Sequence, residues 1–536
     1  MTVNEKVSEE FVPYFESLIG VYDEHMLEVQ LERWRALSSK FRETYNMPAD
    51  FVARSPGRVN VIGEHIDYSW FGVLPMAITQ DVLVAVSVAG SSEDGENQLV
   101  LSNTNPRFPT RTFNVNELES YAIDSTHLEW SNYFLSGFKG ALKLLNAQSS
   151  EPIKFPNMKC LIDGRIPTGG GLSSSSAFVC AALLSVLSAV RCYREGTDSL
   201  ATYSVSRSEL VGSAVVSERF VGVNSGGMDQ SASVFGLRDH ALYVQFVPEL
   251  DVTPLEFAKT SPPLAFVIAN SLVVADKHVT GPIHYNLRVV ETTLAAEVLA
   301  KMLKTGPLVS RDGFGGTLKG FFDGYCKLHQ LPVGTIEEQH AAFALAIKDV
   351  QSTLTQTAGY TMAEIADILE MSETELRKKY TSKFPIRADK LQLLARTLHV
   401  LEEAFRVLKF RSVMTIRGAE YLSAEDSGHY LKQIGELLNQ SMTSCRYQYD
   451  CSCPELNELT SLALEAGAIG SRLTGAGWGG STVNLIQLDK AESFIETLTT
   501  KYYNKRFPEL TKEQLADAIC VSRPANGSAI VKLASF

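Results

Sequence analysis

With 536 residues, the chain is too long for one ordinary hydrophobic core, so two large domains are expected. A hydrophobic content of 45% and a charged content of 21% are typical of a globular protein. The 49 basic and 61 acidic residues give a net charge of −12, which disfavours nucleic acid or an anionic membrane as the main partner. Local backbone N–H groups can still hold an anionic ligand on such a protein.

Eight cysteines are scattered along the chain, and none forms a C-x-x-C pair. Cys451 and Cys453 alone would supply too few ligands for zinc, so we expect reduced thiols and a cytoplasmic protein. The N-terminus turns acidic at Glu9, which is not typical of a signal peptide. The longest apolar run, residues 177–190, is too short and too serine-rich to span a bilayer.

In chain order, the first half alternates between predicted helices and strands. Residues 1–48 are predicted to be helical, with apolar side chains near helical spacing at Leu27, Val29, Leu31, Trp34 and Leu37. Valine-rich runs predict strands at residues 51–53, 82–88, 99–102 and 159–162. Residues 177–190 are apolar nearly all round, which predicts a buried helix. Ser206 and Glu209 have the spacing of a capping box that opens a helix towards Glu218.

The second half is expected to begin with strands at residues 265–270 and 272–274. Residues from about 290 to 440 are predicted to be mainly helical, with a glycine-rich interruption at 313–316. Strands are expected again at residues 482–486 and 530–533. The predicted class is therefore α+β, with mixed sheets and helices packed on them, in two domains at residues 1–255 and 256–536.

The most informative segment is residues 55–68, Ser-Pro-Gly-Arg-Val-Asn-Val-Ile-Gly-Glu-His-Ile-Asp-Tyr. Polar side chains interleave there with glycine and apolar residues, at Arg58, Glu64, His65 and Asp67. Short polar groups converging from a partly buried segment suit a ligand with many hydroxyl groups, each of which needs a partner. A histidine alone is more often structural, but the position of His65 between two carboxylates favours a binding role.

Residues 167–177, Pro-Thr-Gly-Gly-Gly-Leu-Ser-Ser-Ser-Ser-Ala, stand directly before the apolar helix. Glycines allow close backbone approach, and the start of a helix offers unpaired N–H groups to an anion. Serine hydroxyls can bond phosphate oxygens or join a Mg²⁺ shell. The segment is not a Walker P-loop, and a flexible linker is disfavoured because the helix follows at once.

Residues 471–480 formally contain G-x-G-x-x-G, but a strand pattern follows where a dinucleotide fold needs a helix. Residues 222–230 place Asp229 after glycines, where an aspartate is usually a turn or cap residue. The alternative is a base that takes the proton of an attacking hydroxyl, with an arginine as its partner. Pattern alone would make Glu218 a solvent-facing helix residue and Trp130 a core residue.

Three separated motifs in this order carry a resemblance to a known family. Residues 55–77 resemble the galactokinase signature, residues 167–177 resemble the phosphate-binding motif of the GHMP kinases, and residues 471–480 resemble the third motif of that family. Residues 399–404 and 451–456 are similar to the longer eukaryotic galactokinases, including the fungal ones. The resemblance implies the two-domain GHMP kinase fold, with the active site in the cleft between the domains.

The resemblance also implies roles for individual residues. Asp229 would be the catalytic base, with Arg58 as its partner. Galactose would be bound by Arg58, Glu64, His65, Asp67, Gly226, Asp229 and Tyr285. ATP would be bound by Trp130, whose ring would pack on adenine, and by Gly169, Gly170, Gly171, Leu172, Ser173, Ser174, Ser175 and Ser176. Mg²⁺ would be bound by Glu218 together with Ser175, with Ser174 as the alternative serine.

The implied activity is transfer of the γ-phosphate of ATP to the C1 hydroxyl of galactose, with galactose and ATP as the small-molecule partners. Two alternatives are an N-acetylgalactosamine kinase and a galactose- and ATP-dependent sensor that binds a transcriptional regulator. Residues 360–376 resemble a DNA-binding helix-turn-helix, but Glu373 and Glu375 stand where DNA phosphates would need Lys or Arg. We expect this segment to pack as a helical elaboration of the second domain, and we expect neither nucleic acid nor membrane as a partner.

Overall fold

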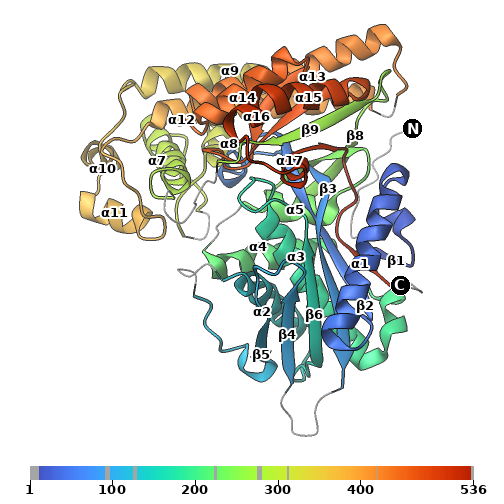
Figure 1. Ribbon diagram of the computed structural model, residues 1–536. Helices are drawn as coiled ribbons and strands as arrows, with labels where there is room; N and C mark the ends of the chain where they lie inside the picture. The colour runs from blue at the N-terminus through green and yellow to red at the C-terminus, as the bar shows by residue number, and fades with distance from the viewer. Residues whose placement is uncertain are drawn as a thin grey trace.

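The computed structural model describes residues 11–90, 97–124, 129–222, 226–273, 281–310, 313–418 and 420–532. Figure 1 shows a lower part built from the blue to green segments and an upper part built mainly from the yellow to red helices. The end of the chain, drawn red, returns to the lower part. Helices pack on sheets in both parts, as the predicted α+β class requires.

The lower part contains a seven-stranded sheet in the order β1-β13-β2-β3-β6-β4-β5. Its neighbouring strands are antiparallel except for the pairs β1/β13 and β4/β6, which are parallel. The strands are β1 (Tyr14–Phe15), β2 (Phe51–Ile62), β3 (Leu74–Ala89), β4 (Gln98–Asn103), β5 (Arg111–Asn114), β6 (Asn157–Gly164) and β13 (Ala529–Val531). The predicted strands at 51–53, 82–88, 99–102 and 159–162 are all present.

Both faces of this sheet are covered, as β3 illustrates. Val82, Val84 and Val86 belong to the core that includes helix α3 (Ser174–Glu195), whereas Leu83 and Ala85 belong to a separate cluster beneath helix α1 (Leu27–Tyr45). Successive side chains of a strand point to opposite faces, so this division follows from the alternation of the strand.

Helix α1 confirms part of the prediction for residues 1–48. Trp34, Leu37 and Phe41 are buried against the sheet. Val29 and Leu31 are 61% and 37% exposed, so their assignment to the apolar face was wrong. They lie on the outward side of α1, which the helical repeat of about 3.6 residues turns away from the sheet. Residues 1–10 lie outside the described part of the chain.

Helix α3 is buried as predicted and packs on β2 and β3. It is long and apolar enough to cross a membrane, but 83% of its most apolar window is buried inside the fold, so here it is a core helix. Helices α2 (Ser131–Gln148), α4 (Arg207–Glu218) and α5 (Met228–Phe235) surround it. The hydroxyl of Ser206 accepts the N–H of Glu209 at 3.4 Å, so the predicted cap of α4 is present.

The upper part contains a four-stranded sheet in the order β10-β11-β9-β12, and strands β7 (His240–Gln245) and β8 (Asp251–Glu256) form a separate hairpin. The four strands are β9 (Leu264–Asn270), β10 (Gly470–Thr474), β11 (Ser481–Gln487) and β12 (Ile519–Ser522). The predicted strand at 272–274 was wrong, because β9 ends at Asn270 and Leu272 has a φ of 60°. Val274 lies outside the described residues.

Residues 290–440 are mainly helical, as predicted. Further helices follow this region: α14 (Pro454–Glu465), α15 (Ala491–Leu498), α16 (Asn504–Arg506) and α17 (Lys512–Ala518). The helices of the predicted region are α7 (Tyr285–Leu303), α8 (Leu318–Leu328), α9 (Ile336–Thr353), α10 (Met362–Leu369), α11 (Glu373–Thr381), α12 (Leu393–Arg417) and α13 (Ala424–Tyr447).

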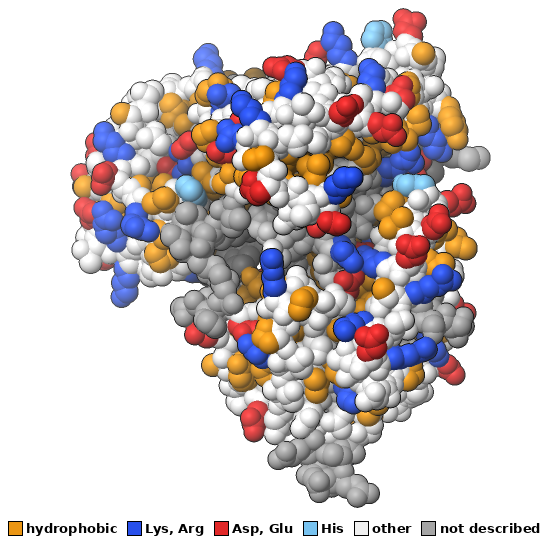
Figure 2. All heavy atoms as spheres, in the orientation of Figure 1, with side chains coloured by type: hydrophobic (Ala, Val, Ile, Leu, Met, Phe, Trp, Pro, Cys, Tyr) orange, Lys and Arg blue, Asp and Glu red, His pale blue; other side chains and the backbone are white. Residues whose placement is uncertain are grey.

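The segment that resembles a helix-turn-helix forms α10 and α11, and α10 packs on α7 as expected. Their buried side chains include Ile365, Leu376 and Tyr380. On the face shown in Figure 2, basic and acidic side chains are interspersed without a patch of one sign.

The division near residue 255 stays a prediction. Strand β13, from the end of the chain, pairs with β2 in the first sheet and covers residues 529–531 of the predicted 530–533. Leu533 lies outside the described residues.

Candidate active site

Arg58 and Asp229 are 171 positions apart in the sequence but form an ion pair, with Nε of Arg58 2.8 Å from Oδ1 of Asp229. Arg58 lies on β2, and Asp229 lies in the first turn of α5. The Arg58 side chain is 6% exposed and that of Asp229 is 22% exposed, so the carboxylate remains open to a ligand. Nη1 of Arg58 also donates to the carbonyl oxygen of Gly171 at 2.7 Å.

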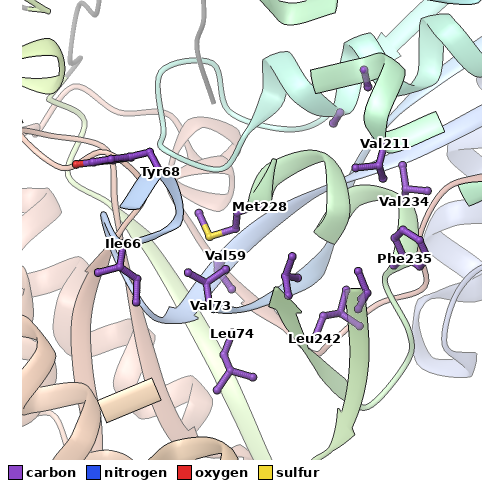
Figure 3. Close-up of a cluster of buried hydrophobic side chains, with 14 of the residues drawn as sticks. Val59, Ile66, Tyr68, Val73, Leu74, Val211, Met228, Val234, Phe235 and Leu242 are labelled. Carbon is purple, nitrogen blue, oxygen red and sulfur yellow. The ribbon is translucent and has the colours of Figure 1, made fainter. Parts of the chain in front are cut away.

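Hydrophobic packing sets the geometry of this pair. Val59, the neighbour of Arg58, and Met228, the neighbour of Asp229, belong to one buried cluster, labelled in Figure 3, and β2 contacts α5. Both side chains are buried, together with Val234 and Phe235 farther along α5. Because interiors are close-packed, this shared core fixes β2 against α5 and thereby sets where Arg58 and Asp229 lie relative to each other.

The predicted phosphate loop leads directly into α3. Gly169 and Gly171 both have a φ of 73°, a conformation that glycine adopts without strain. Ser173, at the N-cap of α3, has a φ of 58°, and its hydroxyl is buried without a hydrogen-bond partner within the described residues. The loop therefore places an uncommitted hydroxyl at a helix N-terminus.

The third glycine cluster covers this loop. A Cβ atom at Gly475 would lie 2.5 Å from the carbonyl oxygen of Gly171, so the two backbones approach as closely as glycine permits. The hydroxyl of Ser481 donates to the carbonyl oxygen of Gly170 at 2.6 Å. These contacts join β11 of the upper part to the phosphate loop of the lower part.

Glu218 closes the other side of the loop. It is fully buried at the end of α4. The interpretation of Glu218 as a solvent-facing helix residue, which the pattern alone favoured, was therefore wrong. Its Oε2 accepts a hydrogen bond from the hydroxyl of Ser176 at 2.8 Å and another from the amide of Gln230. A buried carboxylate and serine hydroxyls form a set of oxygen donors, the kind that Mg²⁺ prefers.

Glu64 follows β2 and is 2% exposed. Its Oε2 accepts from Nη2 of Arg472 at 2.9 Å and from the backbone N–H of Gly475 at 3.1 Å. Burial raises the pKa of Glu64 to about 7, although Arg472 and Arg58 favour the charged form.

Asp67 and Gly226 are in direct contact. A Cβ atom at Gly226 would lie 2.2 Å from Oδ2 of Asp67, so no residue with a side chain fits at position 226 without displacing the carboxylate. Glycine at position 226 therefore leaves the space that the carboxylate of Asp67, a residue 8% exposed, occupies.

His65 lies in an aromatic cluster, and both of its ring nitrogens bond to protein. Nε2 donates to the carbonyl oxygen of Ala476 at 2.9 Å, and Nδ1 is 3.0 Å from the hydroxyl of Tyr68. The ring centroid is 5.9 Å from that of Tyr285, which begins α7. Burial lowers the pKa of His65 to about 3, so the ring is neutral.

Comparison with known proteins agrees with this arrangement. Residues 39–88 match the galactokinase galactose-binding signature, and residues 135–237 and 428–505 match the N-terminal and C-terminal domains of the GHMP kinases. The chain is 40% identical to galactokinase from Saccharomyces cerevisiae over 518 residues, which cover 94% of this chain and 95% of the yeast protein. A Candida parapsilosis galactokinase is 40% identical over 510 residues, 94% of each chain. The chain belongs to the galactokinase family.

The fold is also that of a solved galactokinase. Lactococcus lactis galactokinase, determined in complex with galactose, is 24% identical, with a TM-score of 0.60, and the match covers 93% of this chain and 100% of the bacterial one. The α+β GHMP kinase fold predicted from the motifs is therefore confirmed, as is membership of a family of ATP-dependent sugar kinases.

Trp130 stands at the N-cap of α2, and its indole N–H donates to the carbonyl oxygen of Pro109 at 3.2 Å. Its ring lies nearly parallel to that of Phe178 on α3, at an interplanar angle of 7° and a centroid distance of 6.4 Å. Sequence reasoning did not single out Phe178, because an aromatic residue in an apolar helix carries no signal beyond core packing.

Other residues that build this galactokinase-family site were also missed. Arg472 and Gln230 stand inside quoted motifs but were given no role, although they bond to Glu64 and Glu218. Tyr449 bonds to Tyr68 through their hydroxyls. Of these residues, only Arg472 could have been found from the sequence. It is an arginine inside a glycine-rich motif, and a buried arginine needs an acidic partner.

Acid should weaken the fold through His399 on α12, which is fully buried. Burial lowers the pKa of His399 to about 4 from 6.5, although the nearby Glu403 favours the charged form. Its contribution to stability is therefore complete above pH 6.5 and is lost as the pH falls towards 4. Between pH 6.5 and 5.5, the free energy of unfolding should fall by about 1 kcal/mol more in the wild type than in His399→Gln.

Urea unfolding of both proteins at the two pH values measures this difference. Equal pH dependence in both proteins would show that His399 is not held neutral in the folded state.

Proposed function

We propose that the protein transfers the γ-phosphoryl group of ATP to the C1 hydroxyl of galactose, with Asp229 as the base. The observation that carries the proposal is the 2.8 Å ion pair between Arg58 and Asp229, from which Arg58 also reaches the carbonyl oxygen of Gly171 in the phosphate loop. A base must lie beside both the attacking hydroxyl and the phosphate, and this carboxylate borders the segments assigned to each.

The sugar contacts proposed for this site are Arg58, Glu64, His65, Asp67, Gly226, Asp229 and Tyr285. Supporting this set, Asp67 touches Gly226, and His65 and Tyr285 belong to one aromatic cluster. The two ring nitrogens of His65 are engaged with protein, which leaves its ring face and its backbone for any contact with a sugar.

For the nucleotide, we assign the phosphates to residues 169–176 and adenine to Trp130. The start of α3 supplies N–H groups and the positive end of the helix dipole. Phosphoryl transfer depends mainly on positioning and charge neutralisation, so this loop would hold the γ-phosphate near Asp229.

The oxygen donors around Glu218 fit Mg²⁺, and within the described residues the buried hydroxyl of Ser173, at the start of the same helix as Ser176, has no hydrogen-bond partner of its own. Glu218 would hold the ion together with a serine of the loop. The predicted serine is Ser175, but Ser176 is the one bonded to Glu218 in the fold. Bound Mg²⁺ would neutralise charge on the β- and γ-phosphates.

Ser481→Ala tests the assignment of the phosphate loop. The variant loses the hydrogen bond to the carbonyl oxygen of Gly170, so we expect the KM for ATP to rise about two- to tenfold while the KM for sugar stays unchanged. Steady-state kinetics with each substrate varied in turn would measure this. The matched control is Ser471→Ala, another buried serine of the same sheet, which bonds to Asn484 instead. An equal rise in both variants would contradict the assignment.

The function itself is tested by ATP turnover with galactose and with N-acetylgalactosamine, each with and without Mg²⁺. Turnover that requires Mg²⁺ and favours galactose is the expected result. Preference for the acetylated sugar would overturn the choice of substrate. Galactose binding without turnover would instead favour a sensor that binds a transcriptional regulator.

We place the protein in the cytoplasm because its eight cysteines are all unpaired thiols.

A further inference from the structure

Side chains of helix α12 form hydrogen bonds with both the backbone N–H and the backbone carbonyl oxygen of Glu64. Oε1 of Glu403 accepts the backbone N–H of Gly63 at 2.9 Å and that of Glu64 at 3.3 Å. Nε2 of His399 donates to the carbonyl oxygen of Glu64 at 3.0 Å. Positions 399 and 403 are four residues apart and therefore lie on one face of α12.

Glu403 is itself rigidly held. It is fully buried, its Oε2 accepts from Nε of Arg406 at 2.7 Å, and its Oε1 also accepts from the hydroxyl of Ser441 on α13 at 2.6 Å. Burial alone would raise the pKa of Glu403, but Arg406, with His399 and Arg472, lowers it to about 2. The carboxylate is therefore charged at neutral pH and makes strong bonds to the backbone N–H groups.

Gly63 and Glu64, the residues bonded to Glu403, lie just beyond the end of β2. The pairing of β2 with β3 ends at Ile62, so within the described residues the N–H groups of Gly63 and Glu64 have no strand partner. Gly63 has a φ of 109° and His65 a φ of 61°, and such a turn needs outside support. A Cβ atom at Gly63 would lie 3.0 Å from a methyl carbon of Val407, which shows how closely α12 approaches.

We propose that Glu403 and His399 are positioning residues for the sugar site: through the backbone of residues 63 and 64 they fix Glu64, and with it the turn that carries His65 and Asp67. This proposal rests on the proposed function. Neither residue needs to touch the substrate, since the carboxylate of Glu403 is fully used by protein donors. The helical region thereby acquires a role in sugar binding that is separate from phosphate binding.

Glu403→Gln is the first test. The amide keeps the shape but loses the charge, and its NH₂ group would face the guanidinium of Arg406. We expect the KM for galactose to rise at least about tenfold, which corresponds to about 1.4 kcal/mol, because the charge-assisted hydrogen bonds to the two backbone N–H groups are weakened. The kcat and the KM for ATP should stay within about threefold, because Glu403 bonds directly to the backbone of residues 63 and 64 and not to Arg58, Asp229 or residues 169–176.

Amide hydrogen exchange gives a readout that does not depend on activity. In Glu403→Gln, the amides of Gly63 and Glu64 should exchange faster, whereas those within β2 should not change. The matched control is Glu297→Gln, a helix carboxylate that accepts the backbone N–H of Gly316, outside the sugar segment. If Glu403→Gln does not fold, the same measurements can be made on His399→Gln, which keeps the buried carboxylate of Glu403.

Two results would overturn the proposal: unchanged exchange at both amides, or a parallel loss of affinity for galactose and for ATP. If the wild type did not act on galactose at all, the proposed function would fail, but the exchange measurement would still decide whether Glu403 holds the turn.

Discussion

Asp229→Asn should lower kcat by about 10²- to 10⁴-fold, the usual contribution of a general base. Asparagine has nearly the same shape as aspartate and can still accept a hydrogen bond from Nε of Arg58, but it cannot take a proton from a sugar hydroxyl. The KM for galactose should change only a few-fold, because the other proposed sugar contacts remain. Steady-state kinetics with saturating ATP would measure both quantities.

Equilibrium binding of galactose is the control for this variant. Retained binding with lost turnover would place Asp229 in the chemical step, and Arg58→Ala should behave in the same way, since it removes the partner that orients the carboxylate. Normal turnover by Asp229→Asn would show that the catalytic assignment is wrong.

Gly226→Ala should weaken galactose binding at least about tenfold, which corresponds to about 1.4 kcal/mol. The new methyl group would lie 2.2 Å from Oδ2 and 2.8 Å from Cγ of Asp67, far inside van der Waals contact, so the carboxylate must move. Asp67→Ala should likewise act mainly on sugar binding. Isothermal titration with galactose would measure the affinity of both variants.

Gly212→Ala is the matched control, because a Cβ atom at this position on α4 would meet no atom of the described residues within 4 Å. Alanine favours a helix over glycine, so this variant should bind galactose normally and unfold no more easily than the wild type. If Gly226→Ala bound galactose as well as Gly212→Ala does, the contact between Gly226 and Asp67 would not matter for the site.

Local patterns predicted those parts of the fold that local chemistry determines. The alternating valines of β3 and the all-round apolar character of α3 each required burial, and both are buried. The apolar run at 272–274 was misread because so short a run does not report backbone conformation, and Leu272 is left-handed. The prediction grouped Val29 and Leu31 with the buried residues of α1 because they are hydrophobic. Their positions along the helix nevertheless place them on its outward side.

Long-range contacts within the site could not be predicted from spacing. Arg472 and Glu64 are 408 positions apart, and Glu403 and Gly63 are 340 apart, so their pairing depends on how β10 and α12, respectively, pack against the first sheet. The family resemblance supplied the pair Arg58–Asp229, which the residues alone left open. For the metal site the resemblance indicates Ser175, with Ser174 as the alternative, whereas the hydroxyl bonded to Glu218 in the fold is that of Ser176.

The identity of the phosphorylated product decides which reaction the protein catalyses. The purified protein would be incubated with ATP, Mg²⁺ and galactose, and the products followed by ³¹P NMR. We expect ADP and galactose 1-phosphate to form in equal amounts, and both to form at least about 100-fold more slowly with Asp229→Asn. Phosphate at another hydroxyl of the sugar, or ADP formed without any sugar phosphate, would contradict this expectation.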